Sequence, residues 1–298
     1  AFGTAGWSDD YGDDYDTVNY SRESCAGALN VNMTLSTGNV RDTHGTYDTV
    51  SGIENIIGTS KADTFRGSDT SRYEAFVGMA GNDTINGGGG VDDEVRYDRE
   101  SGTLGVIVNL VTGVAKDAYG ATDSLSGIER VRGTMRADNI TGNDAANRFR
   151  TFAGNDTING GNGSDTVQYH QDREQKDLSG NYGTNGIRVD LTAGFARDGY
   201  KALDTLVSIE HVWATDYMDR VVGNGSANYF RLYDGHDYAL GLGGNDTILG
   251  HDGNDSISGG LGNDSLDGGS MADLLNGGAG IDTMTGGRGW DTFQFDAT

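Results

Sequence analysis

The sequence predicts an all-β fold, a parallel β-roll or β-helix solenoid built from GGxGxDxUx repeats with strand-rich spacers between them. Three observations support this fold class. A nine-residue repeat fills the C-terminal part of the chain, a longer repeat recurs before it, and the 298 residues include no proline. Because proline removes a backbone donor and is confined to sheet edges and bulges, its absence favours a long β ladder.

The nine-residue repeat is clearest over residues 214–294, which divide into nine consecutive units. In the last six units, glycine stands first, aspartate sixth and a large apolar residue eighth. The aspartates are Asp246, Asp255, Asp264, Asp273, Asp282 and Asp291, and the apolar residues are Ile248, Ile257, Leu266, Leu275, Met284 and Phe293. We expect six residues of turn and three of strand in each unit, with two units per coil and the aspartates of alternate units along opposite edges.

Other units keep this frame with fewer of its residues. Asp219, Asn228 and Asp237 stand sixth in the first three units of the run, where we expect weaker or absent metal sites. Earlier units carry Asp83, Asp156 and Asp165, and degenerate units carry Asp63 and Asp138. In the stretch 87–95, either Asp92 or Asp93 could take the sixth position.

Between these runs lie three spacers, residues 28–59, 105–134 and 186–215, with alternating strand patterns. They divide the chain into three predicted cassettes, residues 1–86, 87–159 and 160–298, which we expect to form one continuous solenoid. Each spacer repeats three carboxylates: Asp42, Asp48 and Glu54, then Asp117, Asp123 and Glu129, then Asp198, Asp204 and Glu210. They either cap strands and face water or form additional calcium sites.

The repeated turns suit calcium. Glycines permit crowded or positive-φ backbone that aims carbonyl oxygens inward, and the sixth residue adds a carboxylate. Calcium takes six to eight hard oxygen ligands, which two stacked turns could supply. We therefore expect several Ca²⁺ ions at a set of residues that comprises Asp83, Asp156, Asp165, Asp246, Asp252, Asp255, Asp264, Asp273, Asp282, Asp291, Gly241, Gly243, Gly250, Gly259, Gly268, Gly277 and Gly286.

The composition limits the partners. With 45 acidic and 21 basic residues the net charge is −24, and no basic stripe suggests nucleic acid. No run of 18 apolar residues predicts a membrane span, and the first residues do not resemble a signal peptide. Cys25 is alone, so no internal disulfide can form. The N-terminal aspartates Asp9, Asp10, Asp13, Asp14 and Asp16 form either a further ion site or a frayed acidic end.

The nonapeptides resemble the RTX repeats of the hemolysin-type, calcium-binding proteins that bacteria export by type I secretion. The spacers, with D-T-V-x-Y (Asp16–Tyr20, Asp165–Tyr169) and S-G-I-E (Ser51–Glu54, Ser126–Glu129), are similar to those flanking such runs. The resemblance implies export as an unfolded chain, folding on extracellular calcium, and a secretion signal at the extreme C-terminus. This sequence stops inside its last predicted strand, without such a signal, and we therefore expect it to be a fragment. Met271 at a glycine position puts its own site in doubt.

No enzymatic activity is expected. The five histidines form no H-E-x-x-H pair, and no G-x-S-x-G occurs. We expect a calcium-binding structural module of a secreted or surface protein such as an adhesin. The alternative is a non-catalytic accessory region of an exported enzyme, for export, folding or binding of surface or extracellular polysaccharide.

Overall fold

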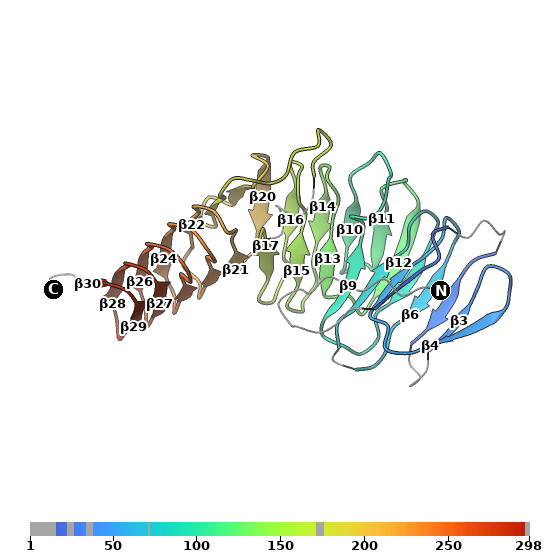
Figure 1. Ribbon diagram of the computed structural model, residues 1–298, viewed down its shortest axis with the longest axis horizontal. Coiled ribbons are helices and arrows are strands. Elements are labelled where there is room, and N and C mark those ends of the chain that lie inside the picture. The colour runs from blue at the N-terminus through green and yellow to red at the C-terminus, as the bar shows by residue number, and fades with distance from the viewer. Residues whose placement is uncertain (1–15, 23–26, 34–37, 71, 171–175, 296–298) are drawn as a thin grey trace. The chain divides into compact units, whose positions relative to one another are not determined.

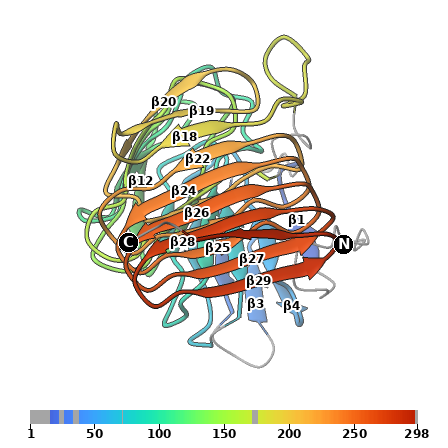
Figure 2. The same ribbon diagram turned by 90° about the vertical axis from the view of Figure 1, so that its left-hand side faces the viewer.

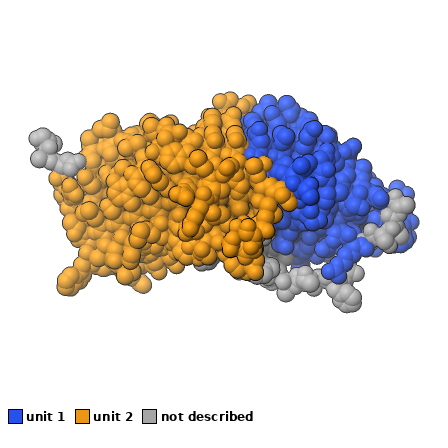
Figure 3. All heavy atoms as spheres, turned by 90° about the horizontal axis from the view of Figure 1, so that it is seen from above, with its two compact units in different colours: residues 1–134, 138–143 blue, residues 135–137, 144–298 orange. Residues whose placement is uncertain are grey.

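The computed structural model describes residues 16–22, 27–33, 38–70, 72–170 and 176–295. Every regular element within these ranges is a β-strand. Figure 3 shows two compact units, unit 1 (residues 1–134 and 138–143) and unit 2 (residues 135–137 and 144–298). The division into three cassettes stays a prediction. Cys25, Asp9, Asp10, Asp13 and Asp14 lie outside the described residues.

Unit 2 contributes strands to two sheets (Figures 1 and 2). The first has the order β15 (Arg148–Arg150), β17 (Thr166–Gln168), β21 (His211–Trp213), β23 (Tyr229–Arg231), β25 (Thr247–Leu249), β27 (Ser265–Ser270) and β29 (Thr283–Arg288), all parallel. The second has the order β16 (Thr157–Asn159), β20 (Leu203–Val207), β19 (Phe195–Arg197), β18 (Arg188–Asp190), β22 (Arg220–Val222), β24 (Tyr238–Gly243), β26 (Ser256–Leu261), β28 (Leu274–Ala279) and β30 (Thr292–Gln294).

Successive nonapeptide strands alternate between these two sheets, which confirms the predicted coil. In register, Thr247 pairs with Ser265, and Ser256 pairs with Leu274. Units two apart therefore stack in one sheet, and a parallel β-roll results. The last strands run six residues, through the final three positions of one unit and the first three of the next.

Unit 1 repeats the arrangement. Its first sheet has the parallel order β1 (Thr17–Asn19), β5 (Asn55–Ile57), β7 (Glu74–Val77), β9 (Asp93–Arg96) and β13 (Arg130–Arg132). Its second has the order β4 (Tyr47–Val50), β3 (Gly38–Arg41), β2 (Asn30–Asn32), β6 (Thr64–Arg66), β8 (Thr84–Asn86), β12 (Thr122–Ser126), β11 (Val114–Lys116), β10 (Ile107–Asn109) and β14 (Asn139–Thr141).

Each spacer forms a three-stranded antiparallel meander within the second sheet. In unit 1 the meander of the second spacer, residues 105–134, enters the sheet in reverse chain order, because its last strand, β12, pairs with β8, and its first strand, β10, pairs with β14. In unit 2, β20 pairs with β16 and β18 with β22 in the same way. The second and third meanders thus interrupt an otherwise parallel sheet without ending it, whereas the first, β2–β3–β4, joins the sheet, among the described residues, only through β2 and β6.

The core of the β-roll consists of the eighth residues of the units. Ile248, Ile257, Leu266 and Leu275 are at most 1% exposed, whereas Phe293 in the final coil is 42% exposed. Burying such a side chain stabilises a fold by about 1.5–3 kcal/mol, so each coil gains little from its two core residues. The thin core leaves an important part of the stability to the turns.

Candidate metal centre

The sixth-position aspartates form two ladders along the edges of the β-roll. In each step, Oδ1 of one aspartate accepts a hydrogen bond from the backbone N–H of the residue one coil earlier. Asp255 receives such a bond from Asp237, Asp264 from Asp246, and Asp273 from Asp255, each at 2.8 Å, and Asp282 and Asp291 continue the two ladders at 3.0 and 3.1 Å. The carboxylates therefore lie on opposite edges in alternate units, as the period predicts.

The second oxygen of these carboxylates is different. Oδ2 is buried and has no hydrogen-bond partner in Asp83, Asp165, Asp237, Asp246, Asp255, Asp264 and Asp273. A buried carboxylate oxygen without a partner is costly, because it loses its hydration and gains nothing in return. A row of such atoms at a fixed period indicates sites that suit a positively charged partner.

The first-position glycines make room for this oxygen. A Cβ atom built on Gly241, Gly250, Gly259, Gly268, Gly277 or Gly286 would collide with Oδ2 of the aspartate five residues later. Their φ angles are not in the positive range, so these glycines are required for the close approach of the carboxylate. This refines our expectation, because positive φ is found at the second and fourth positions instead.

The second position separates open turns from capped turns. In the open turns that hold an unpartnered Oδ2, the second residue has a positive φ, such as 77° at Leu242, 72° at His251 and 112° at Gly260. In the two degenerate units and in the first unit of the C-terminal run, Thr59, Thr134 and Thr215 take this position without a positive φ. Threonine is β-branched and strongly disfavours that region, so the turn adopts another backbone path.

Capped turns satisfy their carboxylates internally. The N–H of Thr215 donates to Oδ2 of Asp219 at 2.7 Å, and the hydroxyl of Thr215 donates to both carboxylate oxygens. Thr59 caps Asp63 in the same way, and the N–H and hydroxyl of Thr134 donate to Asp138. These carboxylates therefore have little need of a cation.

Asn228 also lacks an open oxygen. Its Oδ1 accepts from the N–H of Asn224 at 3.0 Å, and its Nδ2 donates to the carbonyl of Glu210 at 2.9 Å. Asp237, in contrast, has the ladder bond and the unpartnered Oδ2 of a complete unit. The structure thus separates the three units that we expected to be weak, because Asp219 and Asn228 are satisfied and Asp237 is open.

Electrostatics of the open turns also favour a cation. Burial raises the pKa of Asp246 and Asp255 to about 6, with a smaller contribution from the next aspartate of each ladder, Asp264 and Asp273 respectively. Burial, with Asp219, Asp255 and Asp234 nearby, raises the pKa of Asp237 to about 9. A bound cation reverses this effect, because it favours the ionised carboxylate.

The residues of the open turns fit calcium. Among the described residues, no three His, Cys, Asp or Glu side chains converge on a metal position. Each open turn instead offers one carboxylate oxygen, a stacked carboxylate one coil away, and the backbone carbonyls of a glycine-rich turn. That all-oxygen set suits Ca²⁺ and disfavours zinc or copper, which prefer nitrogen and sulfur.

Several predicted ligands have particular surroundings. Asp282 and Asp291, in the last coils, are less buried than the other predicted sixth-position aspartates, and Asp252, at a third position, is exposed. A Cβ atom built on Gly243 would meet no heavy atom closer than 3.9 Å, so nothing there requires a glycine. Asp252 forms a β-bridge with Ser270 through its backbone. Asp156 is 1% exposed at its sixth position.

The ambiguous stretch 87–95 is resolved in favour of Asp93. Asp93 is the first residue of β9, is 1% exposed, and has both carboxylate oxygens buried without partners. Asp92 instead forms an ion pair with Arg130. The turn therefore contains one residue more than a regular unit.

Sequence reasoning left the role of the spacer carboxylates open, and the structure places several of them in the ladders. Asp123 and Asp204 accept hydrogen bonds from the N–H groups of Asp83 and Asp156, at 2.9 and 3.1 Å. Glu129 and Glu210 accept from Asp93 and Asp165 on the other edge, at 3.2 and 2.9 Å. The two spacers share the pattern D-x-L-x-x-I-E, which contains these aspartates and glutamates. The pattern marks the carboxylates, but it does not show which backbone N–H group each of them pairs with.

The other spacer aspartates have a local role. Oδ1 of Asp117 accepts from the N–H groups of Tyr119 and Ala121, and Asp198 does the same with Tyr200 and Ala202. Asp42 binds the N–H groups of His44 and Thr46. These bonds close the turns between the second and third strands of the meanders.

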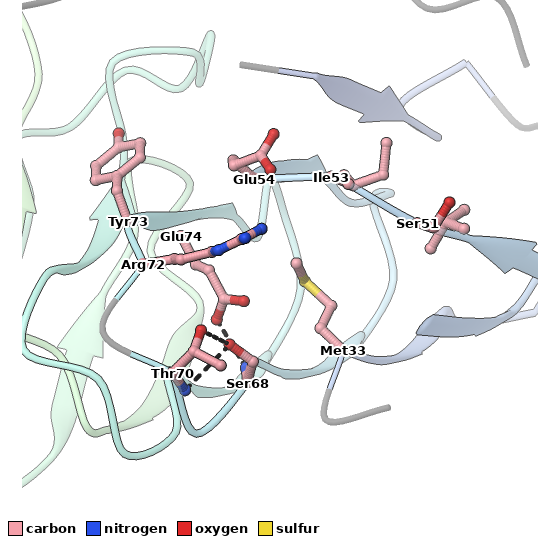
Figure 4. Close-up of a pocket in the computed structure, with 11 residues that line it drawn as sticks. Met33, Ser51, Ile53, Glu54, Ser68, Thr70, Arg72, Tyr73 and Glu74 are labelled. Atoms are coloured by element: carbon pink, nitrogen blue, oxygen red, sulfur yellow. Dashed lines mark hydrogen bonds between the residues drawn. The ribbon is translucent and has the colours of Figure 1, made fainter. Parts of the chain in front are cut away.

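A pocket of about 250 Å³ lies in unit 1 (Figure 4). Its lining includes Arg72, Glu54 and Glu74, and the hydroxyls of Ser68 and Thr70 hydrogen bond at 2.7 Å. Among its described lining residues there is no histidine or cysteine.

In unit 2, His170 and His251 stack on the ring of Tyr233.

The described residues contain no helix that is long and apolar enough to cross a membrane.

A search of the curated proteins found no match to the chain. Comparison with known families matched the RTX calcium-binding nonapeptide repeat (4 copies) at residues 74–93, 132–167, 213–248, 233–266 and 267–297. These segments include the open turns of both units. The chain therefore contains RTX calcium-binding nonapeptide repeats of the hemolysin type, in multiple copies.

Proposed function

We propose that the chain is a non-catalytic structural module that folds when its open turns bind extracellular calcium. The observation that carries the proposal is the row of buried, unpartnered Oδ2 atoms from Asp237 to Asp273. Each turn contributes one such atom, and the turns of each edge stack on one another. Without a cation these carboxylates repel one another along each ladder. With calcium the same atoms hold successive coils together.

Energetics agree with a calcium-dependent fold. The core contributes two apolar side chains per coil, whereas ordering the backbone costs about 1–2 kcal/mol per residue. At a calcium concentration ten times the dissociation constant, each site contributes about 1.4 kcal/mol by mass action. Extracellular calcium modules bind at about 10⁻⁴–10⁻³ M, so the cytosol leaves such sites empty and the exterior fills them.

The setting that best suits this behaviour is a bacterial protein exported by type I secretion, since RTX repeats are typical of such proteins. The module would give rigidity and spacing in a surface protein such as an adhesin. The same calcium-dependent folding would serve an accessory region of an exported enzyme.

The test is a calcium titration of the purified chain followed by circular dichroism, with magnesium as the control cation. We expect the β signal and the compactness of the chain to rise cooperatively with calcium and to be lost on chelation, and magnesium to have little effect. An unchanged signal between chelator and millimolar calcium would refute the proposal.

A further inference from the structure

The second spacer of unit 1, residues 105–134, adds a carboxylate to a nonapeptide turn. The backbone N–H of Asp83 donates to Oδ1 of Asp123 at 2.9 Å, and the N–H of Ser124 donates to the carbonyl of Asp83 at 2.8 Å. Asp123 thus holds the place beside Asp83 that Asp264 holds beside Asp246. The partner comes 40 residues later, from the last strand of the meander, and not one nonapeptide coil later.

Carboxylate oxygens in this region are buried without hydrogen-bond partners. Asp83 and Asp123 are each 1% exposed and Asp117 is fully buried. Oδ2 of Asp83, Oδ2 of Asp117 and Oε1 of Glu100 have no partner. Glu100 is held in place by its other oxygen, which accepts from the N–H of Ala118 at 3.0 Å.

These four carboxylates act on one another. Burial, together with the charges of Asp117, Asp123 and Asp83, raises the pKa of Glu100 to about 9. Burial likewise raises the pKa of Asp83 to about 8, with contributions from Asp123, Asp63 and Asp117. A concentration of buried negative charge of this kind is stabilised by a cation.

We propose that Asp83 and Asp123, together with backbone carbonyl oxygens beside them, bind a calcium ion at the junction between the nonapeptide run of unit 1 and its second spacer, residues 105–134. Asp123 lies outside every segment that matches the RTX repeat. Because no three acidic or histidine side chains converge among the described residues, carbonyl groups complete the ligand set, and Asp117 and Glu100 add negative charge around it.

This inference rests on the proposed function, since it extends the calcium site of an open turn to a ligand from a spacer. Asp123→Asn is the sharpest variant, because the amide oxygen still accepts from the N–H of Asp83 while the charge is lost. Asp69→Asn, at an exposed position of unit 1, makes the same change in net charge and is the matched control. Asp264→Asn reports on the nonapeptide sites themselves.

The experiment counts bound calcium by equilibrium dialysis and metal analysis on the full chain and its three variants. We expect Asp123→Asn and Asp264→Asn each to lose one calcium equivalent, or to bind it at least tenfold more weakly, and Asp69→Asn to match the wild type. A loss in Asp264→Asn alone would overturn the junction site and leave the proposed function intact. A wild-type chain that binds no calcium would overturn both.

A second measurement does not depend on how the variant folds. In a crystal structure of the calcium-loaded wild-type chain, we expect electron density for a cation within coordination distance of both Asp83 and Asp123. Density that is confined to the turns of residues 237–291 would refute the inference.

Discussion

The backbone N–H of Asp246 donates a 2.8 Å hydrogen bond to Oδ1 of Asp264, which lies 18 residues later in the chain. The other oxygen of Asp264 is buried and has no partner. One carboxylate therefore joins two coils through a hydrogen bond and offers a ligand to a cation at the same time.

These two roles of Asp264 can be separated by substitution. Asp264→Asn retains an acceptor for the N–H of Asp246 and removes the charge, whereas Asp264→Ala removes both. In saturating calcium we expect both variants to be destabilised, and Asp264→Ala by about 1–3 kcal/mol more, because it leaves a buried N–H unpaired. Urea unfolding monitored by circular dichroism measures the difference, and equal free energies of unfolding would contradict the double role.

Open and capped turns should differ in calcium binding. Asp219 and Asp237 are consecutive members of one ladder, but Thr215 caps Asp219 whereas Oδ2 of Asp237 is open. We expect Asp237→Asn to lose one calcium equivalent and Asp219→Asn to lose none, as counted by isothermal titration calorimetry. A loss in both variants would show that the threonine cap does not exclude calcium.

The first-position glycines should not tolerate a side chain. In Gly259→Ala the new Cβ would meet the carboxylate of Asp264, and overpacking of this kind costs about 1–3 kcal/mol. Gly243→Ala is the control, because no heavy atom lies closer than 3.9 Å to its Cβ position and its φ is not positive. There we expect the free energy of unfolding to stay unchanged or to rise by about 0.4–1 kcal/mol. Equal destabilisation in the two variants would argue against the steric role of Gly259.

The calcium-free fold should be favoured by acid. Folding raises the pKa of Asp246 and Asp255 to about 6 and that of Asp237 to about 9, mainly through burial, whereas aspartate in an unfolded chain titrates near about 4. Between these values the folded state binds more protons than the unfolded state, so stability falls as the pH rises from about 4 to about 9. In calcium-free buffer we expect more β signal at pH 5 than at pH 8.

Calcium should remove most of this pH dependence, because it favours the ionised carboxylates, and protons should compete with it. We therefore expect calcium affinity to rise between pH 5 and pH 8 and protons to be released on binding. A calcium-free β signal that grows with pH would contradict the assignment of these carboxylates.

The sequence by itself determined the repeating parts of the protein. Glycine at the first position, aspartate at the sixth and an apolar residue at the eighth specify a turn, a ligand and a core residue within nine neighbouring residues. Each of these properties is local, and stacking the units then follows from the period. For that reason the two edges of aspartates and the core from Ile248 to Leu275 could be predicted.

Only the tertiary structure decided which carboxylates are open and how the spacers enter the sheet. Asp123 accepts from Asp83, and Asp204 from Asp156, across separations of 40 and 48 residues that no local pattern sets. The difference between Asp219 and Asp237 depends on the backbone path at the second position of each turn. The N–H of Thr215 donates to Oδ2 of Asp219, whereas Tyr233, with its positive φ, follows another path. A hydrogen-bond partner is a property of three-dimensional position, whereas the carboxylate that needs it is a property of the chain.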